Sequence, residues 1–251
     1  MVTMPLGNPV ETWAATIGAA PGVRLADLAR DRQPGTGGLL VVVGAHPDDE
    51  TIGAGRFVAE WTRTVGPAVA FTVTAGEACL DHLGVLVPGL ADRREAEWHQ
   101  AVAALGCRPV GSWRVADGTV DQHVEAVAER LGSMIGPGDV VLAPWRHDPH
   151  PDHAAAGEAA ALAALGTGAT LVEYPVWMTV WADPEILERT QYHVVRVEAS
   201  PAAADARVTA LAHYETIAVP QRADVEAVVP PTLLEHYPDQ LALVPGRRSA
   251  A

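Results

Sequence analysis

Short apolar runs alternate with longer helix-like segments along this chain, and this alternation constrains the fold more than any other sequence feature. The first clear run, residues 39–44, consists of branched apolar residues followed by glycine and contains no polar residue. Such a run is typical of a strand that is buried on both faces of a parallel sheet. Further short strands are predicted at residues 69–74, 112–115, 139–143, 170–174 and 192–197.

The segments between these runs have the length and pattern of helices. They are predicted at residues 52–65, 91–105, 120–135, 154–165 and 201–214. Helical crossovers between strands predict an α/β fold with a Rossmann-like, doubly wound, mostly parallel sheet flanked by helices. Residues 1–38 are rich in proline and glycine and are expected to form an N-terminal arm, with a weakly helical stretch at 25–30. Residues 39–251 are expected to form a single α/β domain.

The charge balance excludes several partners and chemistries. The 251 residues include 17 basic and 31 acidic side chains, which give a formal net charge of -14. An excess of carboxylates repels phosphate backbones and anionic lipid headgroups, so no binding of nucleic acid is expected. Every basic residue is arginine. The absence of lysine excludes Schiff-base enzymes and phosphate-loop NTPases.

Cysteine usage and apolar run length indicate a reduced, cytoplasmic protein. The two cysteines, Cys79 and Cys107, are far apart and form no Cys-x-x-Cys pair, so neither a disulfide framework nor a thiolate zinc site is indicated. Both are expected to be small buried hydrophobes. The N-terminal residues do not resemble a secretory signal, and no apolar run reaches about 18 residues, so no membrane span is expected.

Ionisable residues gather directly after two of the predicted strands. Residues 46–50 read His-Pro-Asp-Asp-Glu and follow the strand that ends at Gly44, whereas residues 147–153 read His-Asp-Pro-His-Pro-Asp-His and follow the strand near Ala143. Ligands of open α/β sheets bind at the carboxyl ends of strands, where both clusters are expected to lie. No glycine-rich fingerprint follows the first strand, so a dinucleotide cofactor is not expected.

A divalent cation would balance the crowded carboxylates of the first cluster. A histidine and a carboxylate from this cluster, with a histidine from the second, would give a three-ligand site that leaves a position open for water. The remaining acidic or histidine side chains could then act as general base and general acid. The alternative is that both segments are solvated turns held by Asx-type hydrogen bonds.

At these residues, the sequence resembles the PIG-L/LmbE-like family of zinc-dependent de-N-acetylases. Residues 45–50, Ala-His-Pro-Asp-Asp-Glu, match the family's first motif, and residues 150–153, His-Pro-Asp-His, match its second. The resemblance runs from about residue 39 to 214. It implies that His46, Asp49 and His153 bind one Zn²⁺ per chain, although another divalent metal could occupy the same nitrogen and oxygen ligands.

The same resemblance implies catalytic roles for three further residues. Asp48 would be the general base that takes a proton from the attacking water. His150 would be the general acid that stabilises the oxyanion and protonates the departing amine. Asp152 would orient the ring of His150 and raise its pKa.

Candidate substrate contacts are less specific. Arg94 resembles the arginine of an Arg-x-x-Glu helix start that lies near the substrate in the family, the alternative being an exposed, ion-paired first turn. Trp177 and Trp181 could stack on a sugar ring or simply pack in the core or at the rim.

The chain departs from the family pattern at two places, and two further residues of the motif segments have other expected roles. Asp148 stands where some relatives that act on sugar–inositol conjugates have a tyrosine, and a glutamine common in the family is missing after Tyr214. Glu50 is interpreted as a carboxylate that supports the ligands or caps the helix. His147 is interpreted as a rim residue, because a fourth protein ligand would close the open metal position.

The resulting functional hypothesis is a metal-dependent hydrolase that removes an acetyl or related acyl group from a small-molecule amino-sugar conjugate. Two alternatives are a metal-dependent phosphoesterase and a non-catalytic metal-binding α/β module. The acceptor and the oligomeric state are left open.

Overall fold

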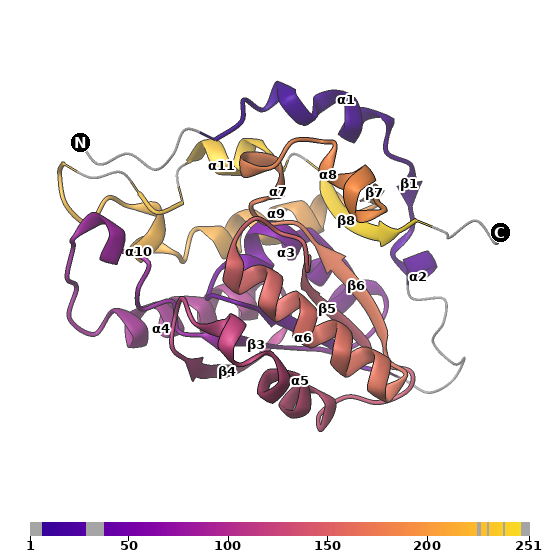
Figure 1. The fold of residues 1–251 in the computed structure, drawn as a ribbon, viewed down its shortest axis with the longest axis horizontal. Coiled ribbons are helices and arrows are strands. Elements are labelled where there is room, and N and C mark those ends of the chain that lie inside the picture. The colour runs from indigo at the N-terminus through magenta and orange to yellow at the C-terminus, as the bar shows by residue number, and fades with distance from the viewer. Residues whose placement is uncertain (1–6, 29–37, 225–226, 230, 238, 247–251) are drawn as a thin grey trace.

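The computed structural model describes residues 7–28, 38–224, 227–229, 231–237 and 239–246. Within them, an eight-stranded sheet has the order β1-β7-β8-β6-β5-β2-β3-β4, and helices cover both of its faces (Figure 1). The strands are β1 (Gly22–Val23), β2 (Leu40–Gly44), β3 (Ala68–Thr74), β4 (Arg108–Val115), β5 (Val140–Pro144), β6 (Thr170–Tyr174), β7 (Tyr192–Val197) and β8 (Gln240–Pro245).

The helices lie between these strands and before the first of them. They are α1 (Glu11–Ala19), α2 (Leu25–Leu28), α3 (Asp49–Thr64), α4 (Leu90–Ala104), α5 (Val124–Gly132), α6 (Pro151–Thr167), α7 (Met178–Trp181), α8 (Ile186–Thr190), α9 (Pro201–Leu211), α10 (Glu215–Ala218) and α11 (Pro231–Glu235), with short 3-10 turns η1 (Asp81–Leu83) and η2 (Val120–Gln122). The predicted doubly wound α/β fold is confirmed.

The central strand β2 divides the core into two layers. Leu40 and Val42 pack in a large core with α3, α4 and α9, whereas Val41 and Val43 pack on the opposite face against α5 and α6. Successive side chains of a strand point to opposite faces, so a strand covered by helices on both sides must be apolar throughout. This double burial explains the absence of polar alternation in residues 39–44.

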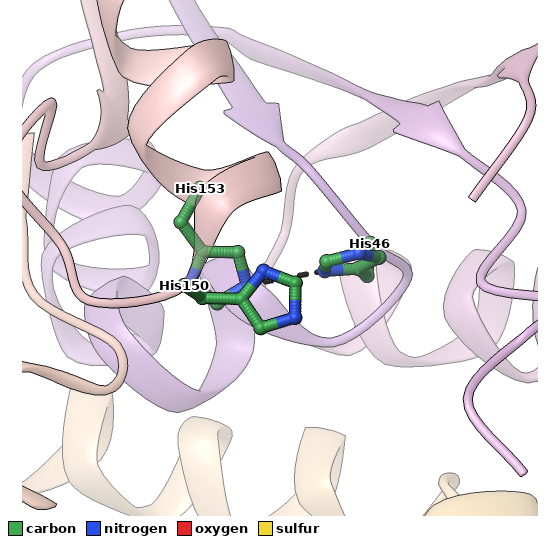
Figure 2. Close-up of side chains that lie close together, drawn as sticks. All are labelled: His46, His150 and His153. Carbon is green, nitrogen blue, oxygen red and sulfur yellow. Dashed lines mark hydrogen bonds between the residues drawn. The ribbon is translucent and has the colours of Figure 1, made fainter. Parts of the chain in front are cut away.

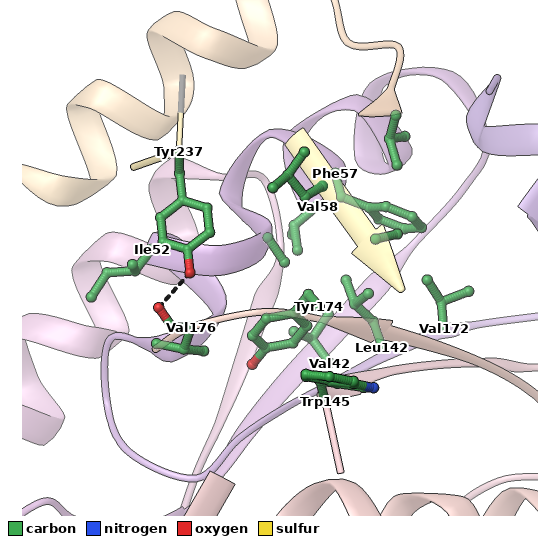
Figure 3. Close-up of a cluster of buried hydrophobic side chains, with 14 of the residues drawn as sticks. Val42, Ile52, Phe57, Val58, Leu142, Trp145, Val172, Tyr174, Val176 and Tyr237 are labelled. Carbon is green, nitrogen blue, oxygen red and sulfur yellow. Dashed lines mark hydrogen bonds between the residues drawn. The ribbon is translucent and has the colours of Figure 1, made fainter. Parts of the chain in front are cut away.

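Part of the large core lies between α3, β6 and β8 (Figure 3). There the hydroxyl of Tyr237 donates a hydrogen bond to the carbonyl of Val176 at 2.6 Å, and the hydroxyl of Tyr174 donates to the carbonyl of Val43 at 2.7 Å. A buried hydroxyl without a partner would cost stability, so these bonds fix both rings. The Tyr174 bond joins the end of β6 to the end of β2, and the Tyr237 bond joins the chain just after α11 to the segment that follows β6.

Strand pairing brings the two motif loops together. β2 pairs in parallel with β3 on one side and with β5 on the other, and Val42 is in register with both Ala70 and Leu142. The carboxyl ends of β2 and β5 are therefore neighbours at one edge of the sheet. The loops after Gly44 and Pro144 must leave that edge side by side.

Both motif helices begin earlier than the sequence predicted. α3 begins at Asp49 rather than near residue 52, and α6 begins at Pro151 rather than near 154. Proline suits the first turn of a helix, and the side chain of His150 caps α6 by accepting a hydrogen bond from the backbone N–H of Asp152. Asp49, Asp152 and His153 therefore lie on the first turns of two helices, where the backbone holds them more rigidly than a loop would.

Other differences arise where tertiary contacts decide the structure. The predicted helix at 120–135 is divided into η2 and α5, and the strand predicted at 112–115 extends back to Arg108 as β4. β8 was not predicted, and it pairs antiparallel with β7 and β6.

Residues 11–28 of the predicted N-terminal arm form α1, β1 and α2. Trp13 is fully buried, and β1 pairs in parallel with β7 at the edge of the sheet. In the described part of the chain, no helix combines the length and the apolar character that crossing a membrane requires.

Candidate metal centre and its cavity

Three ligand atoms from the two motifs converge at one point. Nδ1 of His46 lies 3.1 Å from Nε2 of His153. The dashed line in Figure 2 marks this contact. Nε2 of His153 lies 3.1 Å from Oδ1 of Asp49, and Nδ1 of His46 lies 3.6 Å from Oδ2 of the same carboxylate. Zinc–nitrogen bonds of about 2.0–2.1 Å in a tetrahedral site place two ligand atoms roughly 3.3 Å apart. The spacing of these donors therefore fits a zinc-sized ion.

Each of the two histidines also has a carboxylate on its other ring nitrogen. Nε2 of His46 lies 3.0 Å from Oδ1 of Asp117 and 3.2 Å from Oδ2 of Asp152, and Nδ1 of His153 lies 3.1 Å from Oδ1 of Asp148. Metal-binding histidines typically make this contact, which fixes the ring and its tautomer. The pattern supports a metal centre and argues against two independent solvated turns.

The histidine rings allow a second ligand grouping. One ring nitrogen from each of His46, His150 and His153 lies within 4.8 Å of the other two. A ring nitrogen of His46 and one carboxylate oxygen from each of Asp117 and Asp152 form a similar group. The ring of His150 stacks on that of His153, with the two centroids 4.5 Å apart. Figure 2 shows the two rings beside His46. The carboxylate of Asp49 contacts both buried histidines, His153 at 3.1 Å and His46 at 3.6 Å.

Asp48 lies beside these donors and is held by a buried arginine. Its Oδ2 is 3.3 Å from Nη2 of Arg94, and its φ of 156° is one that residues with a side chain rarely adopt. Burial raises the pKa of Asp48 to about 6, although the charge of Arg94 opposes this shift. A carboxylate with such a pKa suits proton transfer near neutrality.

Arg94 lines the cavity and is not part of an exposed first turn. Its side chain is 3% exposed, and it donates hydrogen bonds to the carbonyls of Gly76 at 2.7 Å and Pro47 at 3.1 Å. The exposed ion-pair alternative is therefore wrong. Glu97, the other end of the Arg-x-x-Glu pattern, instead accepts hydrogen bonds from Thr216.

Asp152 makes different contacts from those that the resemblance implies. Its carboxylate accepts hydrogen bonds from the backbone N–H groups of Gly118 at 2.7 Å and Val120 at 3.2 Å, and it contacts the ring of His46. Only its backbone N–H reaches Nδ1 of His150. The expectation that the carboxylate orients His150 is corrected here, because the first turn of α6 directs the carboxylate toward His46.

The pKa values of the histidines differ with their neighbours. Burial and the charges of His153 and His46 lower the pKa of His150 to about 4, contrary to the expected rise. Burial alone would lower the pKa of His153, but the carboxylates of Asp49 and Asp148 outweigh it and raise that pKa to about 9.

Sequence reasoning missed two carboxylates of this centre. Asp117 follows β4, which pairs with β3 and ends at the same edge of the sheet. Burial alone would raise the pKa of Asp117, but the hydrogen bond and charge of His46, with smaller contributions from Ala78 and Arg94, together outweigh burial and lower it to about 2. Asp148 is 4% exposed and accepts hydrogen bonds from the backbone N–H groups of Val176 and Trp177. The position of Asp117 after a strand was an available signal, whereas the contacts of Asp148 depend on the distant segment after β6.

A cavity of about 390 Å³ opens over the centre. Trp177 and Trp181 line it with their rings stacked 4.2 Å apart and 7° from parallel. Cys79 also lines it and is only partly buried, so the expected burial holds for Cys107 but not for Cys79.

Two further motif neighbours lie away from the cavity lining. His147 is exposed, and its ring contacts Trp145 and Tyr192. Glu50 is buried and accepts hydrogen bonds from Thr51 and Trp98. Glu50 therefore supports the first motif from within the core.

Comparison with known proteins agrees with this geometry. The sequence profile of the PIG-L family, described as GlcNAc-PI de-N-acetylase, matches residues 41–164, which include both motifs. Over these residues, the chain belongs to the PIG-L/LmbE-like family. No curated protein sequence matches the chain significantly.

Solved structures with the same fold include two deacetylases. The zinc-inhibited form of teicoplanin deacetylase Orf2 is 15% identical, with a TM-score of 0.56 over 70% of this chain and 83% of that chain. The A40926 pseudoaglycone deacetylase Dbv21 is 23% identical, with a TM-score of 0.54 over 71% and 81%.

A third solved structure has the same fold and a different activity. GalB, the 4-carboxy-2-hydroxymuconate hydratase from Pseudomonas putida KT2440, is 18% identical, with a TM-score of 0.57 over 80% of this chain and 82% of that chain. The fold alone therefore does not choose between these chemistries, and the site must.

Proposed function

We propose that this protein is a metal-dependent N-deacetylase that hydrolyses the amide of a small acylated amino-sugar conjugate. The observation that carries the proposal is the convergence of His46, Asp49 and His153 at metal-ligand spacing, with Asp48 beside them. The family match and the two deacetylases of the same fold support the same activity.

His46, Asp49 and His153 would hold the divalent ion, with zinc as the expected metal. When bound, the ion would polarise the amide carbonyl and lower the pKa of a water molecule. Asp117 and Asp152 would keep the ring of His46 in place, and Asp148 would do the same for His153.

The protein's own residues would move the protons. Asp48, held against Arg94, would accept a proton from the attacking water. The ring of His150 lines the cavity next to the ligands. With a pKa of about 4 it is neutral near pH 7, so it would first take up a proton and then pass it to the departing nitrogen. Such a proton is needed because an unprotonated amide nitrogen leaves poorly.

The cavity favours amide hydrolysis over the phosphoesterase alternative. Phosphate recognition uses arginine side chains that are free to make paired hydrogen bonds. Arg94 is already committed to Asp48 and to two backbone carbonyls, and Asp48, Asp49 and Asp117 all line the same cavity. A phosphate group would meet these carboxylates.

Release of free amine from methyl N-acetyl-β-glucosaminide, followed after zinc loading, tests the proposal. The intact protein should release amine, and Asp48→Asn should reduce the rate by a factor of about 10²–10⁴ while leaving bound metal unchanged. Asp205→Asn, an exposed change on α9, should leave the rate unchanged and serves as the matched control. Full activity in Asp48→Asn would remove this residue as the base, and no amine release by the loaded protein would contradict the proposed activity.

A further inference from the structure

The cavity over the metal centre has two chemically different halves. The charged half consists of the histidines and carboxylates already described. The other half is apolar and is formed by residues from α3, from the segment after β6 and from residues 228–229: Ile52, Val176, Trp177, Trp181, Val228 and Val229. A sugar ring stacked on one tryptophan would cover only part of this apolar half and would leave the rest of the wall without a complementary partner.

Trp177 and Trp181 are the two largest side chains of this apolar wall, and their rings stack on each other. The backbone N–H of Trp177 donates a 2.9 Å hydrogen bond to Asp148, and Trp177 is 9% exposed. Trp181 is more exposed, and its ring lies within 18° of parallel to His150, with centroids 6.4 Å apart. The exposed part of Trp181 therefore offers an apolar contact to a flat group attached near a reacting amide.

The charges around the cavity select against anionic groups. Among the described lining residues, Arg94 is the only arginine, and its terminal nitrogens already contact Asp48, Pro47 and Gly76. Three lining carboxylates and the net charge of -14 would repel a phosphate or carboxylate group. The complementary occupant of the apolar half is thus an uncharged group.

We propose that the substrate carries a neutral aromatic group next to the scissile amide and that this group packs against Trp177 and Trp181. The inference rests on the proposed deacetylase function and specifies its substrate class. The aromatic group could belong to the acyl side or to the amine side of the amide. The volume of about 390 Å³ is near the lower end for ligand pockets and suits one sugar ring with one such group.

The first test measures binding without turnover. Phenyl β-glucoside and methyl β-glucoside contain no amide, so the intact, zinc-loaded protein cannot consume them during calorimetric titration. We expect the phenyl compound to bind about tenfold more tightly, as stacking on an indole ring would give. Equal affinities, or no binding of either compound, would overturn the inference.

Variants of Trp181 show whether the aromatic wall causes the preference. Trp181→Ala should bring the ratio of the two affinities close to one, whereas Trp181→Phe keeps a flat ring and should retain most of the preference. Circular dichroism would check the fold of both variants. If folded Trp181→Ala still binds the phenyl glucoside more tightly than the methyl glucoside, the aromatic group does not pack against this wall. If Trp181→Ala does not fold, loss of this preference in Trp181→Phe would contradict the inference in the same way.

The second test shows whether the aromatic group belongs to the acyl side or to the amine side of the amide. It also distinguishes failure of this inference from failure of the proposed function. Amine release is compared for methyl N-acetyl-β-glucosaminide, its phenyl glycoside, its N-phenylacetyl analogue and N-acetylglucosamine 1-phosphate. At least one aromatic compound should exceed the methyl reference in kcat/KM by about tenfold, and the phosphate should fall below it. Equal rates for all four would overturn the inference and leave the deacetylase intact. A binding preference without any amine release would instead refute the deacetylase and keep the aromatic site.

Discussion

At the scale of single residues, Asp148 joins the metal centre to the aromatic wall. One carboxylate oxygen accepts hydrogen bonds from the ring of His153 and the backbone N–H of His150, and the other accepts from the N–H groups of Val176 and Trp177. All four partners are donors, so the position requires a group that only accepts. A buried ionised carboxylate meets this requirement.

Asp148→Asn should weaken zinc binding by about 10–100-fold, because the amide NH₂ would face a donor and His153 would lose the carboxylate that orients it. Competition with a chromophoric chelator measures the affinity. Asp205→Asn is again the control of matched chemistry. An unchanged zinc affinity in a folded Asp148→Asn protein would mean that this contact does not position His153.

Sequence alone predicted the proposed ligands in the two motifs but not the carboxylates behind them. The motif residues are recognisable because they are contiguous and follow strands. The role of Asp148 depends on backbone N–H groups almost 30 positions away, and Asp117 reaches His46 from a different loop. Contacts of this kind become visible only when the sheet order is known.

At the scale of elements, the close approach of α6 to the end of β5 positions the second motif. A side-chain carbon at Gly157 would lie 2.4 Å from the carbonyl oxygen of Pro144 and 2.7 Å from the backbone nitrogen of Arg146. Only glycine permits this approach without a shift of backbone. The first turn of the same helix carries Asp152 and His153.

Gly157→Ala should therefore destabilise the protein by about 1–3 kcal/mol, because α6 must move away from the sheet edge. It should also weaken zinc binding. Gly166→Ala lies on the same helix with open space around it and should be neutral or stabilise by about 0.5–1 kcal/mol. Urea unfolding measures both changes; equal effects of the two substitutions would contradict the proposed role of this contact.

The parallel core of the sheet was predictable, and its edges were not. Strands such as β2 and β5 are buried on both faces and therefore have a simple apolar signature. β8 is also mostly buried, but its place depends on antiparallel pairing with β7 across more than 40 residues. Local patterns do not encode such pairing.

At the scale of the whole molecule, the N-terminal residues support the cavity wall. The side chain of Asn8 donates a 2.6 Å hydrogen bond to the carbonyl of Ala182, and the indole N–H of Trp13 donates to the same carbonyl at 3.0 Å. The backbone N–H of Asn8 donates to the carbonyl of Val180. These contacts hold the C-terminal end of the short helix α7, which contains Trp181.

Trp13→Ala should cost about 3–5 kcal/mol of unfolding free energy if the segment is an integral part of the domain. Trp13→Phe keeps most of the buried area and should cost less. Chemical denaturation followed by circular dichroism measures both values. A cost below about 0.5 kcal/mol for Trp13→Ala, as for a surface substitution, would show that the segment behaves as an independent arm.

The central claim is that two sequence-distant motifs form one metal centre, and metal content measures this most directly. Elemental mass spectrometry of tag-free, zinc-loaded protein would compare the intact chain with His46→Ala, His153→Ala and Asp205→Asn. We expect about one ion per chain in the intact protein and in Asp205→Asn, and loss of the ion in both histidine variants. An intact chain without metal, or histidine variants that retain it, would show that the two motifs do not form one metal centre.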